Sequence, residues 1–345
     1  MNTAIPTRRL AAALRDLSLS LALALIAAAP IANSAQGAEP APFDIDRAAA
    51  AVVRLESKVP ADARTAETLG RERAGNGVVI DSDGLVLTIG YLILEASEVT
   101  LTSAEGAAVP AAIVAYDHET GFGLVRALVP LPAQPLRLGD STELTEGDPV
   151  LVLANGGRSQ TLGAFVVGLR EFAGYWEYLL ERAIFTAPAH PNWGGAALVD
   201  RQGRLVGIGS LLVPDAMRGR QTLPGNMFVP VEVLRPILGD LLAGTASGPH
   251  RPWFGIIASD GERGIVVMRV SPGGPAEQAG LRRGDVIHAV SGDRTRTIAE
   301  LYRKLWSLGT AGIEVPLSVR RGEASREVTV RSGDRYRYLK LERAY

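Results

Sequence analysis

The chain has 345 residues, of which 47% are hydrophobic and 21% charged, a composition typical of a folded globular protein with room for two or three domains. Its formal net charge is −1 at pH 7, with basic and acidic residues interspersed, so the charge pattern does not indicate binding to nucleic acid or to an anionic membrane surface. It contains no cysteine, which excludes disulfides, thiolate catalysis and zinc–thiolate sites. Its stability must therefore come from packing.

The N-terminus has the pattern of an export signal. Arginines precede the apolar run 17–31, and small residues follow it. We expect a signal peptide over residues 1–38, cleaved between residues 32 and 38, and a periplasmic or secreted protein. An uncleaved anchor needs about 20 apolar residues, whereas this run is shorter and is broken by Pro30, so we expect no stable membrane span. The pair Arg8-Arg9 leaves open the choice between Sec and twin-arginine export.

Residues 39–69 form an N-terminal segment in which 45–59 suits either a helix or a strand. From residue 75 onwards the pattern predicts many short strands, the first two joined by a turn at Ser82-Asp83-Gly84. Such a series is typical of an all-β sandwich or a pair of barrels. It ends in an expected helix over 231–242 with three leucines on one face. The further strands are expected at 99–102, 112–116, 122–126, 150–154, 163–169, 178–180, 197–199, 205–209 and 227–230.

The stretch 188–199 reads P-A-H-P-N-W-G-G-A-A-L-V and resembles the nucleophile loop N-P-G-N-S-G-G-P-L-V of chymotrypsin-like serine proteases of the HtrA/Deg family. The stretch 75–88, G-N-G-V-V-I-D-S-D-G-L-V-L-T, and the stretch 136–141, L-R-L-G-D-S, resemble two further motifs of that family, in the same order. The resemblance implies a mainly β fold, a chymotrypsin-like double β-barrel over residues 70–243, followed by a PDZ domain.

At the positions of the family's catalytic residues, this sequence departs from the family's pattern. Trp193 stands where the serine belongs, Tyr91 where T-N-x-H-V has its histidine, and Gly121 where D-x-x-T-D-[LI]-A has its aspartate. Indole is no nucleophile, glycine has no side chain, and a phenol with a pKa near ~10 is a poor base at pH 7. Pro191 occupies an oxyanion-hole position and has no N–H to donate. The resemblance therefore implies a protease fold without its catalytic residues.

Two alternatives remain open at this site. His118 and His190 lie on loops that border it by resemblance, so a relocated triad or a metal role is conceivable, although solvated loop histidines are the commoner case. Trp193 and Tyr91 either fill the former cleft or line a ligand groove, and packing is the favoured interpretation. We expect neither a metal nor a cofactor.

A Gly/Ser/Pro linker, residues 244–250, marks a domain boundary. The stretch 271–293, S-P-G-G-P-A-E-Q-A-G-L-R-R-G-D-V-I-H-A-V-S-G-D, is similar to PDZ domains of the HtrA arrangement, which implies such a domain over residues 251–335 and a tail over 336–345. PDZ domains bind an extended peptide along a strand edge and its terminal carboxylate in a nest of backbone N–H groups.

By the same resemblance, the peptide site has two parts. The carboxylate loop is Trp253, Phe254, Gly255 and Ile256, and the side-chain pocket is lined by Ile298, Leu301 and Tyr302. Some of these apolar residues are ordinary core, but the adjacent aromatic residues of the loop, expected on an edge strand, favour the groove.

The sequence supports three hypotheses. The favoured one is an exported, catalytically inactive HtrA/Deg-like protein that binds peptides or protein C-termini as chaperone, scaffold or regulator in envelope quality control, with another envelope protease as a candidate partner. The alternatives are an active serine endopeptidase with a relocated site and a structural subunit of an envelope complex. A homotrimer is the family's usual assembly, and nothing in the sequence indicates nucleic acid as a partner.

Overall fold

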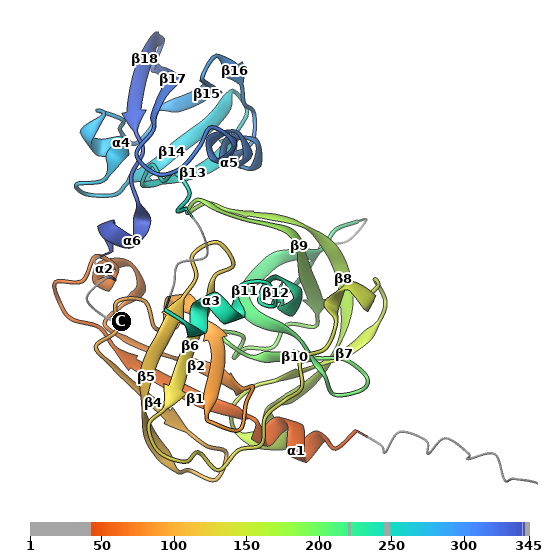
Figure 1. Cartoon of the computed structure of the whole chain (residues 1–345). Helices are drawn as coiled ribbons and strands as arrows, with labels where there is room; N and C mark the ends of the chain where they lie inside the picture. The colour runs from red at the N-terminus through yellow and green to blue at the C-terminus, as the bar shows by residue number, and fades with distance from the viewer. Residues whose placement is uncertain (1–42, 220–221, 245–248, 340, 342–345) are drawn as a thin grey trace, which may run out of the picture. The chain divides into compact units, whose positions relative to one another are not determined.

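The computed structural model describes residues 43–219, 222–244, 249–339 and 341, and it is built mainly from β-strands (Figure 1). The strands form two closed six-stranded barrels and a further six-stranded sheet. The expected signal peptide lies outside the described residues, as does most of the expected linker. Among the helices of the described ranges, none has the length and apolar character needed to cross a bilayer.

The first barrel contains six antiparallel strands in the order β1-β2-β3-β6-β5-β4. The turn between β2 and β3 lies where the sequence predicts it, and Asp81 stabilises it by accepting hydrogen bonds from the N–H groups of Asp83 and Leu85. The strands are β1 (Val52–Lys58), β2 (Glu72–Val79), β3 (Leu85–Ile89), β4 (Glu98–Thr102), β5 (Ala108–Tyr116) and β6 (Phe122–Ala127), with α2 (Ala66–Leu69) after β1 and the 3-10 turn η1 (Gly90–Leu92) after β3.

The barrel begins earlier than the expected boundary at residue 70. The ambiguous segment 45–59 forms both elements, first the helix α1 (Ile45–Ala50) and then β1. Strand β1 alternates buried and exposed residues from Leu55 onwards and pairs with β2 and β4, so it closes the barrel. The domain therefore includes residues that the sequence analysis placed in the N-terminal segment.

The second barrel has the strand order β10-β11-β12-β9-β8-β7. Its longest hairpin, β8–β9, is closed by the three-residue turn 175–177. The strands are β7 (Pro149–Leu153), β8 (Thr161–Gly174), β9 (Tyr178–Ala187), β10 (Ala197–Val199), β11 (Leu205–Met217) and β12 (Leu223–Pro230), with the 3-10 turns η2 (Ser141–Glu143) and η3 (Gly157–Gln160) before β7 and β8.

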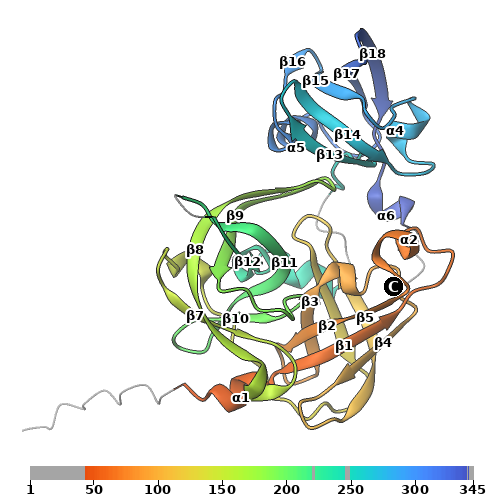
Figure 2. The ribbon, with the colours of Figure 1, turned by 180° about the vertical axis from the view of Figure 1, so that it is seen from behind.

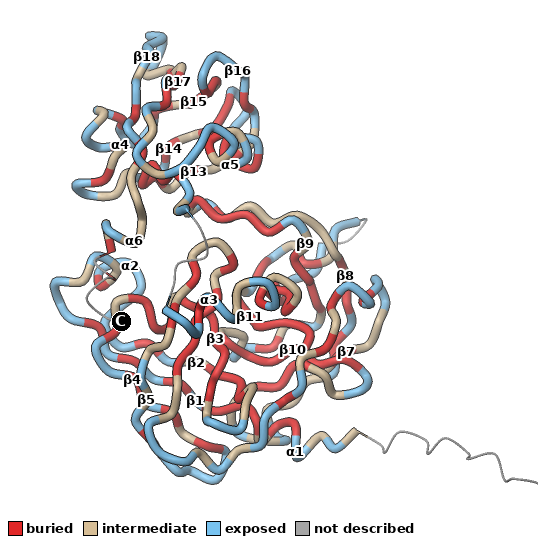
Figure 3. Tube along the Cα trace, viewed as in Figure 1, coloured by how far each residue is buried: buried red, intermediate tan, exposed pale blue. Residues whose placement is uncertain are grey.

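The two barrels share one apolar core. A single cluster of buried side chains includes Leu55 and Phe122 of the first barrel together with Phe185, Ile208 and Met227 of the second. The barrels accordingly lie side by side in both views of the ribbon (Figure 2), and the buried stretches run along their strands (Figure 3). The mainly β, double-barrel fold expected from the sequence is thus confirmed.

Two expected segments differ from the structure. The helix predicted over 231–242 is interrupted, because only the 3-10 turn η4 (Val231–Val233) and the short helix α3 (Leu238–Leu242) are helical, with turns between them. The expected tail after residue 335 is partly structured. It begins within α6 (Arg335–Tyr338), and beyond it Leu339 and Leu341 pack with Leu94 in a separate apolar cluster.

The C-terminal sheet has the order β13-β14-β15-β17-β18, with β16 paired to β15, so β13 is an edge strand. The helix α5 is capped by the Thr297 side chain, which accepts from the N–H of Glu300, and its apolar face is buried in the core of this unit. The elements are β13 (Ile256–Gly261), β14 (Gly264–Val270), α4 (Pro275–Gln278), β15 (Val286–Val290), β16 (Asp293–Arg294), α5 (Ile298–Ser307), β17 (Glu314–Arg321) and β18 (Ala324–Arg331).

A buried ion pair joins the loop before β15 to the end of β17. The Asp285 carboxylate, only 1% exposed, accepts from Arg321 Nε at 2.7 Å and Nη2 at 2.8 Å, and from the Arg282 N–H at 2.9 Å. Burial acts to raise the pKa of Asp285, but the hydrogen bonds from Arg321 and Arg282 outweigh it and the pKa lies below its ordinary value. The pair therefore contributes stability above the carboxylate's ordinary pKa and loses it as the pH falls through the folded value.

We predict that Asp285→Asn lowers the free energy of unfolding of the C-terminal unit at pH 7 by about 2 kcal/mol, because hydrogen bonds to a buried carboxylate are replaced by weaker ones to a neutral amide. The variant should also lose part of the acid dependence of stability below pH ~4. Urea unfolding at pH 7 and pH 3 measures both effects. A variant whose stability falls between these two pH values as steeply as that of the wild type would contradict the assignment.

Candidate functional site

The loop of residues 188–196 connects β9 to β10 and lies between the two barrels. The Asn76 N–H on β2 donates to the Gly194 carbonyl at 2.8 Å, and the Gly195 N–H donates to the Gly209 carbonyl on β11 at 2.8 Å. Gly195 has a φ of +76°, and a Cβ there would lie 1.9 Å from the Asn76 carbonyl oxygen. Only glycine fits this position, so the register of the loop is fixed.

The side chain of Asn76 ties this loop to both barrels. Its Nδ2 donates to the carbonyls of Asn192 at 2.9 Å and Gly194 at 2.8 Å. Its Oδ1 accepts from the Asn155 N–H at 2.8 Å and from Asn155 Nδ2 at 2.6 Å, just beyond β7. The residue is 1% exposed, and all of its amide hydrogen-bonding capacity is used.

We predict that Asn76→Asp lowers the free energy of unfolding by about 3 kcal/mol, because it retains an acceptor for Asn155 but places a charged oxygen against two carbonyl oxygens. Urea denaturation followed by tryptophan fluorescence measures the loss. The control is Asn192→Asp, an exposed amide on the same loop, with an expected change below about 0.5 kcal/mol. Equal losses in the two variants would show that Asn76 does not hold the loop.

Tyr91 lies in η1 and points at this loop. Its hydroxyl donates to the Ser210 carbonyl at 3.1 Å, and a Cβ on Gly194 would lie 2.8 Å from its oxygen. Burial raises the pKa of Tyr91 well above its ordinary value, and a hydrogen bond with the Trp193 side chain opposes this only in part. The phenol thus keeps its proton at neutral pH and cannot serve as a base there.

Gly121 lies next to Tyr91. The Gly90 N–H donates to the Gly121 carbonyl at 2.7 Å, which places Gly121 against η1. The space for a side chain at this position is taken by Tyr178, because a Cβ would lie 3.2 Å from its hydroxyl oxygen. That hydroxyl donates to the Thr120 carbonyl at 2.6 Å. Gly121 also has a φ of +81°, a conformation that side chains rarely adopt.

The structure brings together Tyr91, Gly121 and Trp193, the three residues at the predicted catalytic positions. The Gly121 carbonyl accepts a hydrogen bond from the Gly90 N–H, next to Tyr91 in the chain. The Tyr91 hydroxyl in turn lies against Gly194, the residue after Trp193. Tyr91 packs against the shared apolar core, whereas Pro191 is exposed on the rim. The three positions thus carry the phenol of Tyr91, the backbone alone at Gly121 and the indole of Trp193.

His190 is 3% exposed, so the expectation of a solvated loop histidine is wrong. Its Nδ1 accepts from the Asn192 N–H at 3.0 Å, which leaves Nε2 to donate to the Gln160 carbonyl at 3.3 Å. Burial lowers its pKa, with the bond to Gln160 opposing the shift. Both ring nitrogens of the neutral imidazole are therefore engaged with the backbone, and its structural role explains its burial.

His118 is also held in place rather than solvated. Its Nδ1 lies 3.2 Å from the Tyr116 hydroxyl and its Nε2 lies 2.5 Å from Arg335 Nη1. Burial lowers its pKa well below the ordinary value, and the charges of Arg335 and Arg251 lower it further. Across the residues that the structure describes, no group of three or more histidine, aspartate or glutamate side chains is placed to hold a metal ion.

In the C-terminal unit, all four residues of the expected carboxylate loop are buried. Trp253 precedes β13, pairs with Gly333 through its N–H and carbonyl, and packs its ring 4.5 Å from that of Tyr338. Phe254 is fully buried in the core of this unit. The expectation that their side chains lie on an edge strand and face the groove is therefore wrong, and what the loop offers is its backbone.

The predicted pocket residues Ile298, Leu301 and Tyr302 lie on α5 and are buried. The Tyr302 hydroxyl donates to the Gly174 carbonyl at 2.9 Å and accepts from the Glu177 N–H at 3.1 Å. Helix α5 therefore contacts the turn of the β8–β9 hairpin.

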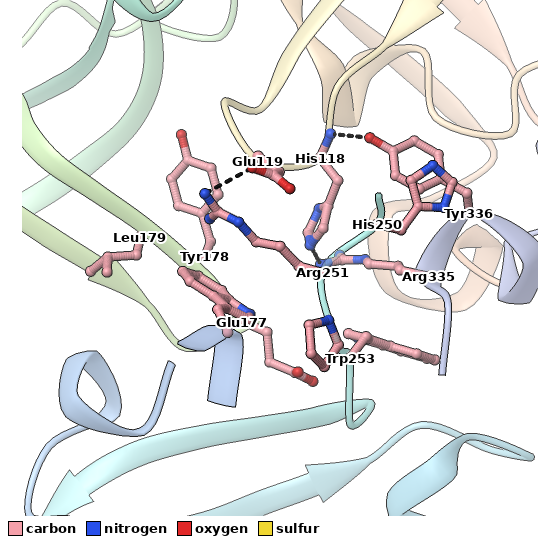
Figure 4. Close-up of a pocket in the computed structure, with 12 residues that line it drawn as sticks. His118, Glu119, Glu177, Tyr178, Leu179, His250, Arg251, Trp253, Arg335 and Tyr336 are labelled. Atoms are coloured by element: carbon pink, nitrogen blue, oxygen red, sulfur yellow. Dashed lines mark hydrogen bonds and ion pairs between the residues drawn. The ribbon is translucent and has the colours of Figure 1, made fainter. Parts of the chain in front are cut away.

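Glu177 is the site residue that the sequence analysis missed. Its carboxylate accepts three backbone hydrogen bonds, from the N–H groups of Phe254 at 2.8 Å, Gly255 at 2.7 Å and Ile256 at 2.9 Å. It belongs to a pocket whose other walls include His118, Arg335 and Trp253 (Figure 4). No local sequence signal marks Glu177, because its partners lie 77 to 79 residues further along the chain.

Comparison with known families matches both parts of the chain. Residues 75–208 match the model of the trypsin-like peptidase domain, and residues 252–331 match the model of the PDZ domain. The chain combines the trypsin-like and PDZ domains of the HtrA/Deg family.

Relatives of this chain are named as serine proteases. The chain is 28% identical over 335 residues to the serine protease HhoA of Synechocystis, a match that covers 84% of this chain and 82% of the relative. It is 27% identical over 276 residues to the periplasmic pH-dependent serine endoprotease DegQ of Escherichia coli, covering 75% of this chain and 59% of DegQ. The chain thus spans well under two thirds of the length of DegQ.

A solved structure has the same fold. The HtrA-type protease AlgW with a decapeptide superposes with a TM-score of 0.51 at 20% identity, covering 84% of this chain and 97% of AlgW. The HtrA/Deg resemblance found in the sequence is confirmed for the fold and for the domain order.

Proposed function

We propose that this chain is an exported HtrA/Deg-like protein without peptidase activity, which binds peptide segments or protein C-termini through its PDZ domain. It would act as a chaperone, scaffold or regulator in envelope protein quality control, on another envelope protease or on misfolded chains. The proposal rests on one observation above all, the replacement of serine, histidine and aspartate by Trp193, Tyr91 and Gly121.

The surroundings of these residues support the loss of activity. Acyl transfer needs a hydroxyl nucleophile, a base of near-neutral pKa and an orienting carboxylate. The imidazoles of His190 and His118 are engaged by Asn192, Gln160, Tyr116 and Arg335, so the groups bonded to them include no serine or threonine hydroxyl. The two histidines therefore lend no support to the alternative of a relocated catalytic site.

We predict that Trp193→Ser alone gives no proteolysis of casein and no labelling by a fluorophosphonate probe, because the new hydroxyl would face a protonated phenol instead of an imidazole. Adding Tyr91→His should also fail, since Tyr178 fills the space of the missing carboxylate. DegQ is the positive control. Turnover by the wild-type chain, abolished by a single Ser→Ala change, would establish the active-peptidase alternative.

Peptide binding is supported by the geometry of the PDZ domain. Strand β13 lies at the edge of its sheet, and the N–H groups of Phe254, Gly255 and Ile256 converge on a single carboxylate. These features are what strand addition and carboxylate capture require. The AlgW structure, which has the same fold, is described as containing a decapeptide.

We predict that decapeptides with a free C-terminal carboxylate bind more tightly than the same peptides with a C-terminal amide, measured by fluorescence polarisation. Gly255→Ala should weaken this binding by about tenfold, because Gly255 has a φ of +80° and a Cβ would lie 3.0 Å from the Trp253 ring. Gly239→Ala in α3, where a Cβ meets nothing within 4 Å, is the matched control.

Other parts of the proposal come from the relatives. A periplasmic or secreted location is favoured because DegQ is named as periplasmic, and a homotrimer is favoured by the family's usual assembly. The remaining alternative, a structural subunit with a blocked groove, has one observation in its favour, the Glu177 carboxylate that lies in the carboxylate loop. Absence of binding by every peptide would support it.

A further inference from the structure

The turn of the β8–β9 hairpin makes the contacts that PDZ domains make with a peptide terminus. The Glu177 side chain, 2% exposed, presents its two oxygens to three consecutive backbone N–H groups. Such a set of converging N–H groups binds an anion, and a peptide terminus would present a carboxylate of the same size and charge. The carboxylate loop therefore already has a carboxyl partner from within the chain. Burial raises the pKa of Glu177, and the hydrogen bonds from the three N–H groups oppose this shift.

Main-chain and apolar contacts add to the similarity between the β8–β9 turn and a peptide bound to a PDZ domain. The Ala258 N–H on the outer edge of β13 donates to the Tyr175 carbonyl at 2.9 Å, two residues beyond the last N–H that binds Glu177. Alternate N–H groups of a strand point to the same edge, so those of Ile256 and Ala258 both face the turn. The turn therefore starts to pair with β13 in the way that a bound peptide strand does. The Leu179 side chain belongs to the apolar cluster of the PDZ domain.

Flanking groups hold the hairpin against α5 and α6. Arg303 on α5 forms ion pairs with Glu171 of β8 and with Glu181 of β9, the latter at 2.7 Å. Arg335 of α6 donates to the Trp176 carbonyl at 3.0 Å. The turn is thus bound on both sides of the carboxylate, as a ligand seated in a groove would be.

The backbone of the turn is strained at the residue that supplies the carboxylate. Glu177 has a φ of +60°, a left-handed conformation that glycine or asparagine adopts more easily. In three-residue hairpin turns this last position normally carries glycine. The strained residue is therefore the one whose side chain binds the neighbouring domain, a combination that points to function.

We propose that the β8–β9 turn is an internal ligand of the PDZ groove, with Glu177 occupying the place of a peptide's terminal carboxylate. The inference rests on the proposed peptide-binding function and adds its regulation, since an external C-terminus has to displace the turn before it binds. If the turn is docked in about 99% of molecules, the apparent affinity for an external peptide falls by about 100-fold.

The test compares the full-length chain with Glu177→Gly. Glycine suits the left-handed conformation, so this variant removes the carboxylate without disfavouring the turn. Glu105→Gly, in an exposed turn of the first barrel, is the matched control. The first readout is deuterium uptake of the segment 253–258 by hydrogen exchange. The second is binding of fluorescent decapeptide pools with an apolar last residue, ending either in a free carboxylate or in an amide.

We expect deuterium uptake of 253–258 to be at least about tenfold faster in Glu177→Gly than in the wild type and in the control. We also expect the free-carboxylate pool to bind the variant about 10 to 100 times more tightly than the wild type, and the amide pool to gain nothing.

Each contrary result has its own meaning. Equal deuterium uptake in the wild type and the variant would overturn the proposal of an internal ligand. Equal peptide binding by both forms would, in that case, still support the proposed peptide-binding function. Faster uptake in the variant without binding of any pool would support the internal ligand and overturn the proposed capture of C-termini, leaving the turn as a permanent clasp of a structural subunit.

Discussion

A buried amide needs two acceptors and two donors, and Asn76 finds them all across the boundary between the barrels. Its partners come from the loop before β10 and from Asn155, two residues after β7, so this one side chain links the first barrel to the second. The registration of the loop, and with it the position of Trp193 opposite Tyr91, depends on these four hydrogen bonds and on the absence of a Cβ at Gly195. These contacts hold the loop without using the side chains of Tyr91 or Trp193.

The region around Tyr91, Gly121 and Trp193 is packed with aromatic side chains. Tyr91 bonds to the backbone of β11, and Tyr178 from β9 takes the space where a side chain at position 121 would begin. Both phenols have hydroxyls that donate to carbonyl oxygens, so they are satisfied as buried polar groups. Under the proposed loss of peptidase activity, restoring hydrolysis would require repacking of these aromatic residues as well as new functional groups.

Local patterns carry much of the fold. The turn at residues 82–84, the short strands and the PDZ motifs are all visible in the sequence because turn residues and alternating burial are encoded within a few positions. The convergence of Tyr91, Gly121 and Trp193 could be anticipated only from the family resemblance. Strand β1 was ambiguous, since its apolar spacing also suits a helix and only pairing with β2 and β4 settles it.

Contacts between distant segments could not be predicted in this way. The burial of His190 depends on backbone groups of Asn192 and Gln160, and that of Trp253 depends on pairing with Gly333. Glu177 appears as an ordinary polar turn residue until the PDZ loop is placed opposite it. The alternation of apolar and polar residues predicts which face of a strand is buried, but it does not predict which loop a turn will contact.

The ion pairs of Arg303 differ in kind from the contact of Glu177. The Arg303 side chain is 44% exposed and that of Glu181 is 73% exposed, whereas the Glu177 carboxylate is shielded from water. Dissolved salt screens exposed charges strongly and buried ones weakly. Raising the ionic strength should therefore weaken the exposed ion pairs of Arg303 while leaving the hydrogen bonds of Glu177 in the carboxylate loop nearly unchanged.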